Sequence, residues 1–133
     1  MKNFIAGLLA QMPEGTVFPD EHMIPMTTAA GEVTAVIPEN DPETVVFRAA
    51  VGSLSGVSDS AGFLRQALAG NRFWAETGGA TLSLGEDETL YLTARYEDAQ
   101  FADETAVGTA LSAFAEVLST WRDRLAIEKG GAK

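Results

Sequence analysis

The sequence contains no cysteine and only one histidine, which removes several kinds of chemistry at once. Without cysteine the chain forms no disulfide and offers no thiolate as a nucleophile or metal ligand, so nothing indicates an oxidising compartment. Basic residues are also scarce: nine Lys and Arg stand against 19 Asp and Glu, which gives a formal net charge of −10. Because a phosphate-binding face needs clustered Lys and Arg, we expect no nucleic-acid partner.

Long hydrophobic runs are missing as well. No apolar stretch approaches the roughly 18 residues of a membrane-spanning helix, so no membrane insertion is expected. Residues 1–12 combine one lysine with a short apolar run but lack a small-residue cleavage site, and we interpret them as mature structure, not a signal peptide. The 133 residues fit one domain spanning positions 1–133, with a cytoplasmic location as the simplest expectation.

Residue types that often catalyse reactions occur, but not at the spacings that catalysis requires. His22 follows two acidic residues, yet neighbours in a strand point to opposite faces, so the trio does not converge without a turn. The acidic runs at 39–41 and 86–88 lack the spacing of a calcium loop. Gly78 and Gly79 match neither phosphate-binding glycine motif. Carboxylates paired by tertiary structure would leave no trace in the sequence, but these motifs predict no enzyme, cofactor or metal site.

The hydrophobic pattern predicts the order helix, three strands, helix, two strands, helix. Loops between consecutive strands are too short for a parallel crossover, so we expect antiparallel pairing. Pro25 interrupts the first strand and therefore favours an edge position or a bulge. The fold class is thus α+β, an antiparallel twisted β-sheet of about five strands with three helices. The expected helices cover 3–12, 60–77 and about 103–129, and the expected strands cover 23–26, 32–37, 44–51, 80–84 and 89–96.

The stretch from Asn71 to Leu84 marks the change from helix to strand. Phe73 and Trp74 end a helical pattern, and the glycine pair that follows permits the positive φ angles that a sharp reversal needs. Apolar and polar residues then alternate as in a strand. This stretch closely resembles the signature of the class I type III secretion chaperones, the Tir chaperone-like family. The resemblance continues through 90–95 and the closing helix around 121–125.

The resemblance implies a homodimeric chaperone that holds the N-terminal region of a secreted effector in extended form and delivers it to a secretion apparatus. The secretion ATPase is a possible further partner. The family pattern places the first helix beside the effector groove, and the middle helix with its following strand at the two-fold axis. The predicted effector-binding residues are Phe4, Ile5, Leu8, Leu9, Met23, Ile24, Met26, Val33 and Ala35. The predicted dimer-interface residues are Phe63, Leu64, Ala67, Leu68, Phe73, Ala80, Leu82 and Leu84.

Two alternatives remain open at this point. Each residue predicted to bind the effector could equally belong to the ordinary core, since a helical or alternating apolar face serves both purposes. The methionines at 23 and 26 are adaptable side chains suited to varied partners. At the level of function, the alternative is a non-secretory interaction or regulatory domain of the same fold.

Overall fold

The computed structural model describes residues 3–71 and 79–131, and the strands within them form one antiparallel sheet. The predicted α+β fold and its element order are confirmed. The elements are α1 (Asn3–Leu9), β1 (Met23–Thr28), β2 (Gly31–Val36), β3 (Thr44–Ser53), α2 (Ser60–Asn71), β4 (Thr81–Leu84), β5 (Thr89–Glu97) and α3 (Thr105–Ala126). A short 3₁₀ helix at Asp98–Phe101, labelled η2, precedes α3, and a π-helical turn at Ile127–Gly131 follows it.

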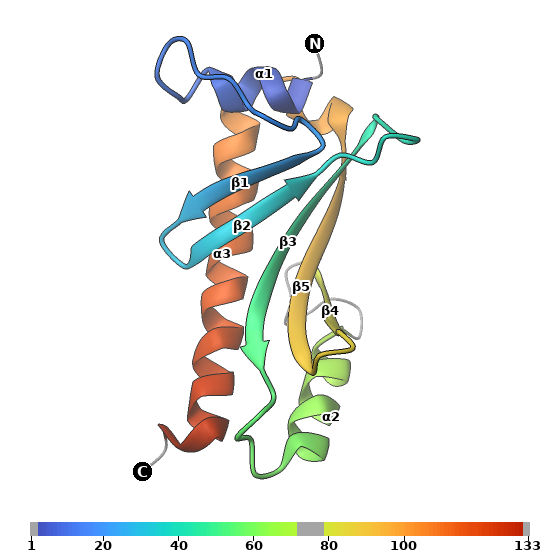
Figure 1. The fold of residues 1–133 in the computed structure, drawn as a ribbon, viewed down its shortest axis with the longest axis vertical. Helices are drawn as coiled ribbons and strands as arrows, with labels where there is room; N and C mark the ends of the chain where they lie inside the picture. The colour runs from blue at the N-terminus through green and yellow to red at the C-terminus, as the bar shows by residue number, and fades with distance from the viewer. Residues whose placement is uncertain (1–2, 72–78, 132–133) are drawn as a thin grey trace.

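The strands lie in the order β1-β2-β3-β5-β4, so β5 is inserted between β3 and β4 (Figure 1). The two edges of the sheet are therefore β1 and β4. Pro25 lies on β1, which agrees with the edge position that its missing N–H predicts. The register between β3 and β5 shifts between Ala50 and Gly52, as at a β-bulge.

One face of the sheet carries the hydrophobic core. Helix α3 runs along the length of this face, while α1 crosses one end and α2 lies at the other (Figure 1). Alternate residues of the central strands are buried against these helices, as period-two patterning requires. Large core side chains with less than 2% exposure include Phe4, Phe47, Phe63, Leu90, Leu92, Leu118 and Trp121.

The boundaries of the first two helices follow from local hydrogen bonds. Helix α1 ends at Leu9, three residues before the predicted end, and a turn with shorter-range bonds continues to Met12. Helix α2 begins where predicted, because the Asp59 carboxylate accepts a hydrogen bond from the N–H of Gly62 at 3.0 Å. A helix as short as α1 does not hold its shape without packing, so its contacts with the rest of the molecule fix its position.

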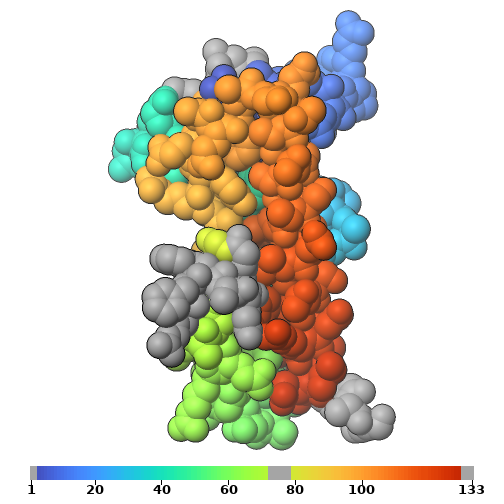
Figure 2. All heavy atoms as spheres, turned by 180° about the vertical axis from the view of Figure 1, so that it is seen from behind, coloured from blue at the N-terminus to red at the C-terminus, as the bar shows by residue number. Residues whose placement is uncertain are grey.

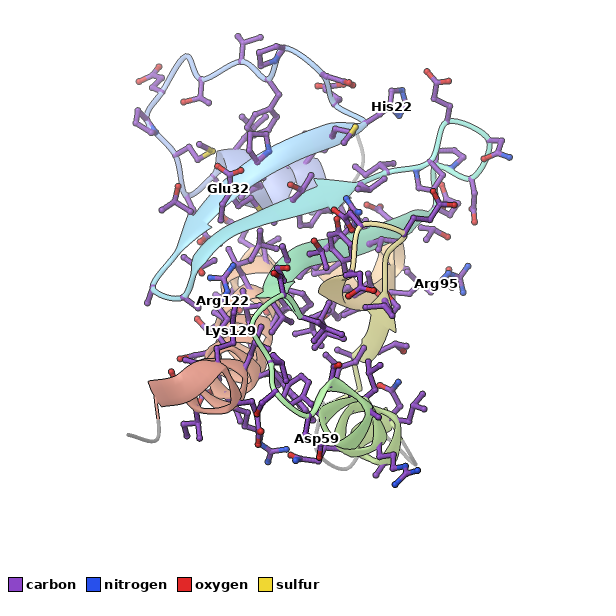
Figure 3. The ribbon with its side chains drawn as sticks, turned by 60° about the horizontal axis from the view of Figure 1, so that its bottom comes forward. His22, Glu32, Asp59, Arg95, Arg122 and Lys129 are labelled. Atoms are coloured by element: carbon purple, nitrogen blue, oxygen red, sulfur yellow. The ribbon has the colours of Figure 1, made fainter. Side chains whose placement is uncertain are left out.

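Helix α3 is also attached to the sheet by one long side chain. The Arg122 guanidinium reaches from α3 and donates to the carbonyl oxygen of Ala50, 2.7 Å from Nη2 and 3.2 Å from Nε. Its Nη1 donates to the carbonyl oxygen of Ala30 in the β1–β2 turn. Figure 3 shows Arg122 between the helix and the strands. The planar fork of the guanidinium thus joins α3, the β3 bulge and the β1–β2 hairpin.

Candidate functional site

Strand β1 offers one long edge of the sheet. The Ile37 N–H donates to the His22 carbonyl at 3.0 Å, so ladder alternation turns the backbone groups of Ile24 and Met26 toward β2. The backbone groups of the intervening positions, Met23, Pro25 and Thr27, face away from the sheet. Since proline has no N–H, this edge presents more acceptors than donors.

A groove lies between the β1–β2 hairpin and α3, next to that edge. It has a volume of about 630 Å³, and its α3 wall consists mainly of small residues. A second hollow continues it past the end of α1, because the two share lining residues. Figure 2 shows the loop at residues 10–22 and the β1–β2 hairpin on the same side of α3. We call this the α3 groove; its lining is Gln11, Thr27, Thr28, Ala29, Ala30, Gly108, Leu111, Ser112, Ala115, Glu116 and Ser119.

Helix α1 closes one end of this region and is packed tightly against α3. A Cβ added to Gly7 would stand 2.9 Å from the Val107 side chain, so the glycine lets the two helices approach closely. The Phe4 ring lies against Phe101 and Phe47, with centroids 5.1 and 5.7 Å apart. These contacts leave little room for α1 to shift.

The predicted effector-binding residues divide into two groups. Met23 is 53% exposed and Leu9 is partly buried, so both have surface available to a partner. The other seven, Phe4, Ile5, Leu8, Ile24, Met26, Val33 and Ala35, are buried in the core of the single chain. They form the core-facing sides of α1, β1 and β2.

The predicted dimer residues also divide. Leu68 is 69% exposed and Leu84 is 47% exposed, which is unusual for leucine in a packed domain, and Leu64 is partly buried. Phe63, Ala67, Ala80 and Leu82 are buried in the core of the single chain. Phe73 lies outside the described residues. The surface of α2 and β4 therefore retains two large leucines.

Titratable groups do not gather into a reactive centre within the described residues. No group of three or more His, Cys, Asp or Glu there is placed to hold a metal ion. The His22 ring contacts the backbone, because its Nδ1 lies 2.8 Å from the Ile37 carbonyl oxygen. Burial raises the pKa of Tyr96, which packs against Phe47 and Phe101. Tyr96 belongs to the aromatic core, not to an open pocket.

The α3 groove was not predicted from the sequence. Its wall includes Gly108, Ser112, Ala115 and Ser119, which recur at spacings of four, three and four residues on one side of α3. The prediction for this helix followed its large apolar residues, which form the neighbouring, core-facing side. The second periodicity was visible in the sequence, but only the structure shows what lies opposite it.

No helix among the described residues is both long enough and apolar enough to cross a membrane. The model of the Tir chaperone protein (CesT) family matches residues 4–122. A sequence comparison with curated proteins finds no match.

Several solved structures share the fold. The crystal structure of the ExsC-ExsE complex aligns with a TM-score of 0.72 at 18% identity, covering 92% of this chain and 90% of the other. The HopA1-SchA chaperone-effector complex aligns with a TM-score of 0.65 at 15% identity, covering 92% and 89%. The heterodimeric ExoU-SpcU complex from the type III secretion system of Pseudomonas aeruginosa gives 0.62 at 19% identity, covering 96% of both chains.

Proposed function

Because this chain belongs to the Tir chaperone protein (CesT) family, we propose that it is a type III secretion chaperone that binds the N-terminal region of a secreted effector. The effector segment is bound in extended form, which keeps it soluble and competent for secretion. The chaperone acts in the cytoplasm, makes and breaks no covalent bonds, and works as a homodimer. The secretion ATPase is a possible later partner that receives the complex.

The observation that carries this proposal is the position of the β1 edge beside the α3 groove. An extended peptide adds to an exposed strand through backbone hydrogen bonds, and pockets for alternate side chains give specificity. Edge and groove together provide both parts of that mode. Solved structures of the same fold include the HopA1-SchA chaperone-effector complex, which supports this proposal.

Strand geometry divides the side chains of such a peptide between two faces. Opposite residues of an antiparallel pair point to the same face of the sheet. Effector residues opposite Ile24 and Met26 would therefore point toward the helices and into the α3 groove. Those opposite Pro25 would lie on the open face of the sheet, next to the exposed Met23 side chain. The small groove residues favour apolar effector side chains of moderate size.

Burial of apolar surface supplies the binding energy. It contributes about 25 cal/mol per Å² of apolar area, from which the cost of ordering a flexible segment must be subtracted. One strand and one groove provide little surplus, so the effector must continue over further surface. Leu9, the last residue of α1, directly precedes Ala10 and Gln11, which line the second hollow, and it is the residue we assign to that extension.

The homodimer is proposed from the α2 and β4 surface. Leu68 and Leu84 are large, apolar and exposed in the single chain, and a second copy would remove them from water. A two-fold axis lets the same surface serve both partners. Leu64, which is partly buried, lies on the same helix and would extend the contact.

The test is capture of a partner from the native host, followed by mapping of its bound segment by hydrogen exchange. We expect an N-terminal segment that is disordered when free and protected when bound. Ala115→Arg fills the α3 groove and should abolish capture. Ala126→Arg, on an exposed site of the same helix, should leave capture unchanged. A folded partner bound equally by both variants would favour the interaction or regulatory domain instead.

A further inference from the structure

The β4 edge of the sheet differs from the β1 edge in how its backbone is occupied. The Gly85 N–H donates to the Thr89 carbonyl at 2.8 Å, so the odd-numbered residues of this strand pair with β5. Ladder alternation then turns the backbone groups of Leu82 and Leu84 away from the sheet. These outward groups would be available to a further strand.

The side chain of Asn71 occupies the outward groups of Leu82. Its Oδ1 accepts from the Leu82 N–H at 2.7 Å, and its Nδ2 donates to the Leu82 carbonyl at 2.9 Å. A side-chain amide carries one acceptor and a pair of donors, so it reproduces the paired bonds that a neighbouring strand residue would make. Asn71 is the last residue of α2, which lies beside β4 (Figure 1).

The sequence of β4 itself adds little protection against pairing. Its four residues, Thr-Leu-Ser-Leu, include no charge and no proline, the usual devices that keep an edge from joining another chain. The exposed Leu84 makes this edge apolar as well. Strand β1, by contrast, contains Pro25, which removes only one donor and leaves its acceptors free.

We propose that Asn71 closes the β4 edge against strand addition, so that the β1 edge is the one at which an extended polypeptide adds. The closure itself requires no effector, while the assignment of the effector strand to β1 rests on the proposed function. Asn71 is a positioning residue here: it binds no partner but determines which edge accepts one. It also prevents copies of the chaperone from pairing backbone to backbone at β4, while the exposed side chains of Leu68 and Leu84 stay available to the proposed dimer.

The test compares Asn71→Leu, which removes both the acceptor and the donor, with Asn40→Leu in the exposed turn before β3 as a matched control. Light scattering over a range of concentrations should show Asn71→Leu associating beyond the state of the unaltered chain. Loss of two hydrogen bonds corresponds to roughly a tenfold to hundredfold stronger self-association. Asn40→Leu should keep the original mass.

A rescue variant separates edge pairing from a general loss of stability. Lysine on an edge discourages strand pairing, so adding Thr81→Lys to Asn71→Leu should restore the original mass. A residue that merely attached α2 to the sheet would give an unstable variant that the lysine does not rescue. That result, or an Asn71→Leu variant of unchanged mass, would overturn the proposal.

Hydrogen exchange on the unaltered chain provides a measurement that does not depend on any variant folding. The Leu82 amide should exchange slowly, because Asn71 accepts its hydrogen, and this protection should not depend on protein concentration. Rapid exchange at Leu82 in the dilute protein would contradict closure of the edge. None of these measurements uses an effector, so their outcome does not depend on whether the proposed chaperone function is correct.

Discussion

The carboxylate of Asp98 accepts a hydrogen bond from the backbone N–H of Phe4 at 3.0 Å, across 94 positions of sequence. The other carboxylate oxygen accepts from the N–H of Asn3 at 2.9 Å. Asp98 is buried, at 5% exposure, and follows the last residue of β5. The N–H groups in the first turn of α1 therefore find their acceptor in the segment between β5 and α3, not in a capping residue next to the helix.

Replacement of Asp98 by alanine should release α1 from the sheet. The variant loses both acceptors at the start of the helix, and the free energy of unfolding should fall by about 1–2 kcal/mol. Chemical denaturation followed by circular dichroism measures this loss, and hydrogen exchange should show it concentrated in residues 3–9. Asp87→Ala, in the exposed β4–β5 turn, serves as the control and should have a much smaller effect. Equal effects would argue against the anchoring role.

Substitution of Arg122 by lysine should weaken the attachment of α3 to the sheet. An ammonium group cannot donate to the Ala30 and Ala50 carbonyls in the fork geometry of guanidinium. Loss of charged hydrogen bonds of this kind costs about 1–3 kcal/mol. Urea unfolding should show the decrease, whereas Arg65→Lys on the exposed side of α2 should change little. A variant as stable as the unaltered chain would show that solvent replaces these contacts.

Sequence periodicity was sufficient for the elements but not for their arrangement. The apolar residues of α3, among them Phe114, Leu118 and Trp121, are buried as their spacing predicted. The strand order could not be predicted in this way. Alternation shows which face of β5 is buried, but it does not show which strands lie beside β5. Leu84 was expected on the same face as Leu82, yet it is 47% exposed at the end of a short edge strand.

Long-range polar contacts could not be predicted from the sequence either. In the sequence, Asp98 is one more acidic residue, and Asn71 is only the start of the stretch in which helix changes to strand. Each acquires its role from a backbone group that only the tertiary structure brings near, Phe4 for Asp98 and Leu82 for Asn71. Candidate-site prediction was limited in the same way, because core and binding residues share one hydrophobic pattern.

Acid should destabilise the chain partly through Asp103. Hydrogen bonds from the backbone N–H and the side chain of Thr105 lower the pKa of this carboxyl below 3.8, its usual value. A pKa lower in the folded state means that the group contributes stability above the unfolded pKa and loses it as the pH falls through the folded pKa. Asp103→Asn should therefore flatten the acid side of a plot of melting temperature against pH. An unchanged slope would contradict this assignment.

Replacement of Leu68 by aspartate should separate the proposed homodimer. The unaltered chain should scatter light as a particle of twice 14.1 kDa, whereas the variant should approach the mass of one chain. Leu68 is 69% exposed in the single chain, so the charge costs the monomer little and its circular dichroism should be preserved. Gln66→Asp, exposed on the same helix, controls for the added charge. A mass of one chain for the unaltered protein would contradict the dimer.

Replacement of Leu9 by aspartate tests whether α1 contributes to effector binding. Leu9 ends the helix and is partly buried against the core, so it has both a packed side and a free side. A charge on an apolar contact should reduce effector affinity by about tenfold or more while secondary structure persists. Titration calorimetry with the captured effector segment measures the affinity, and Ala6→Asp, exposed on the same helix, is the matched control. Collapse of the circular dichroism signal in Leu9→Asp alone would identify Leu9 as a core residue. The effector contact would then have to rest on β1 and the α3 groove.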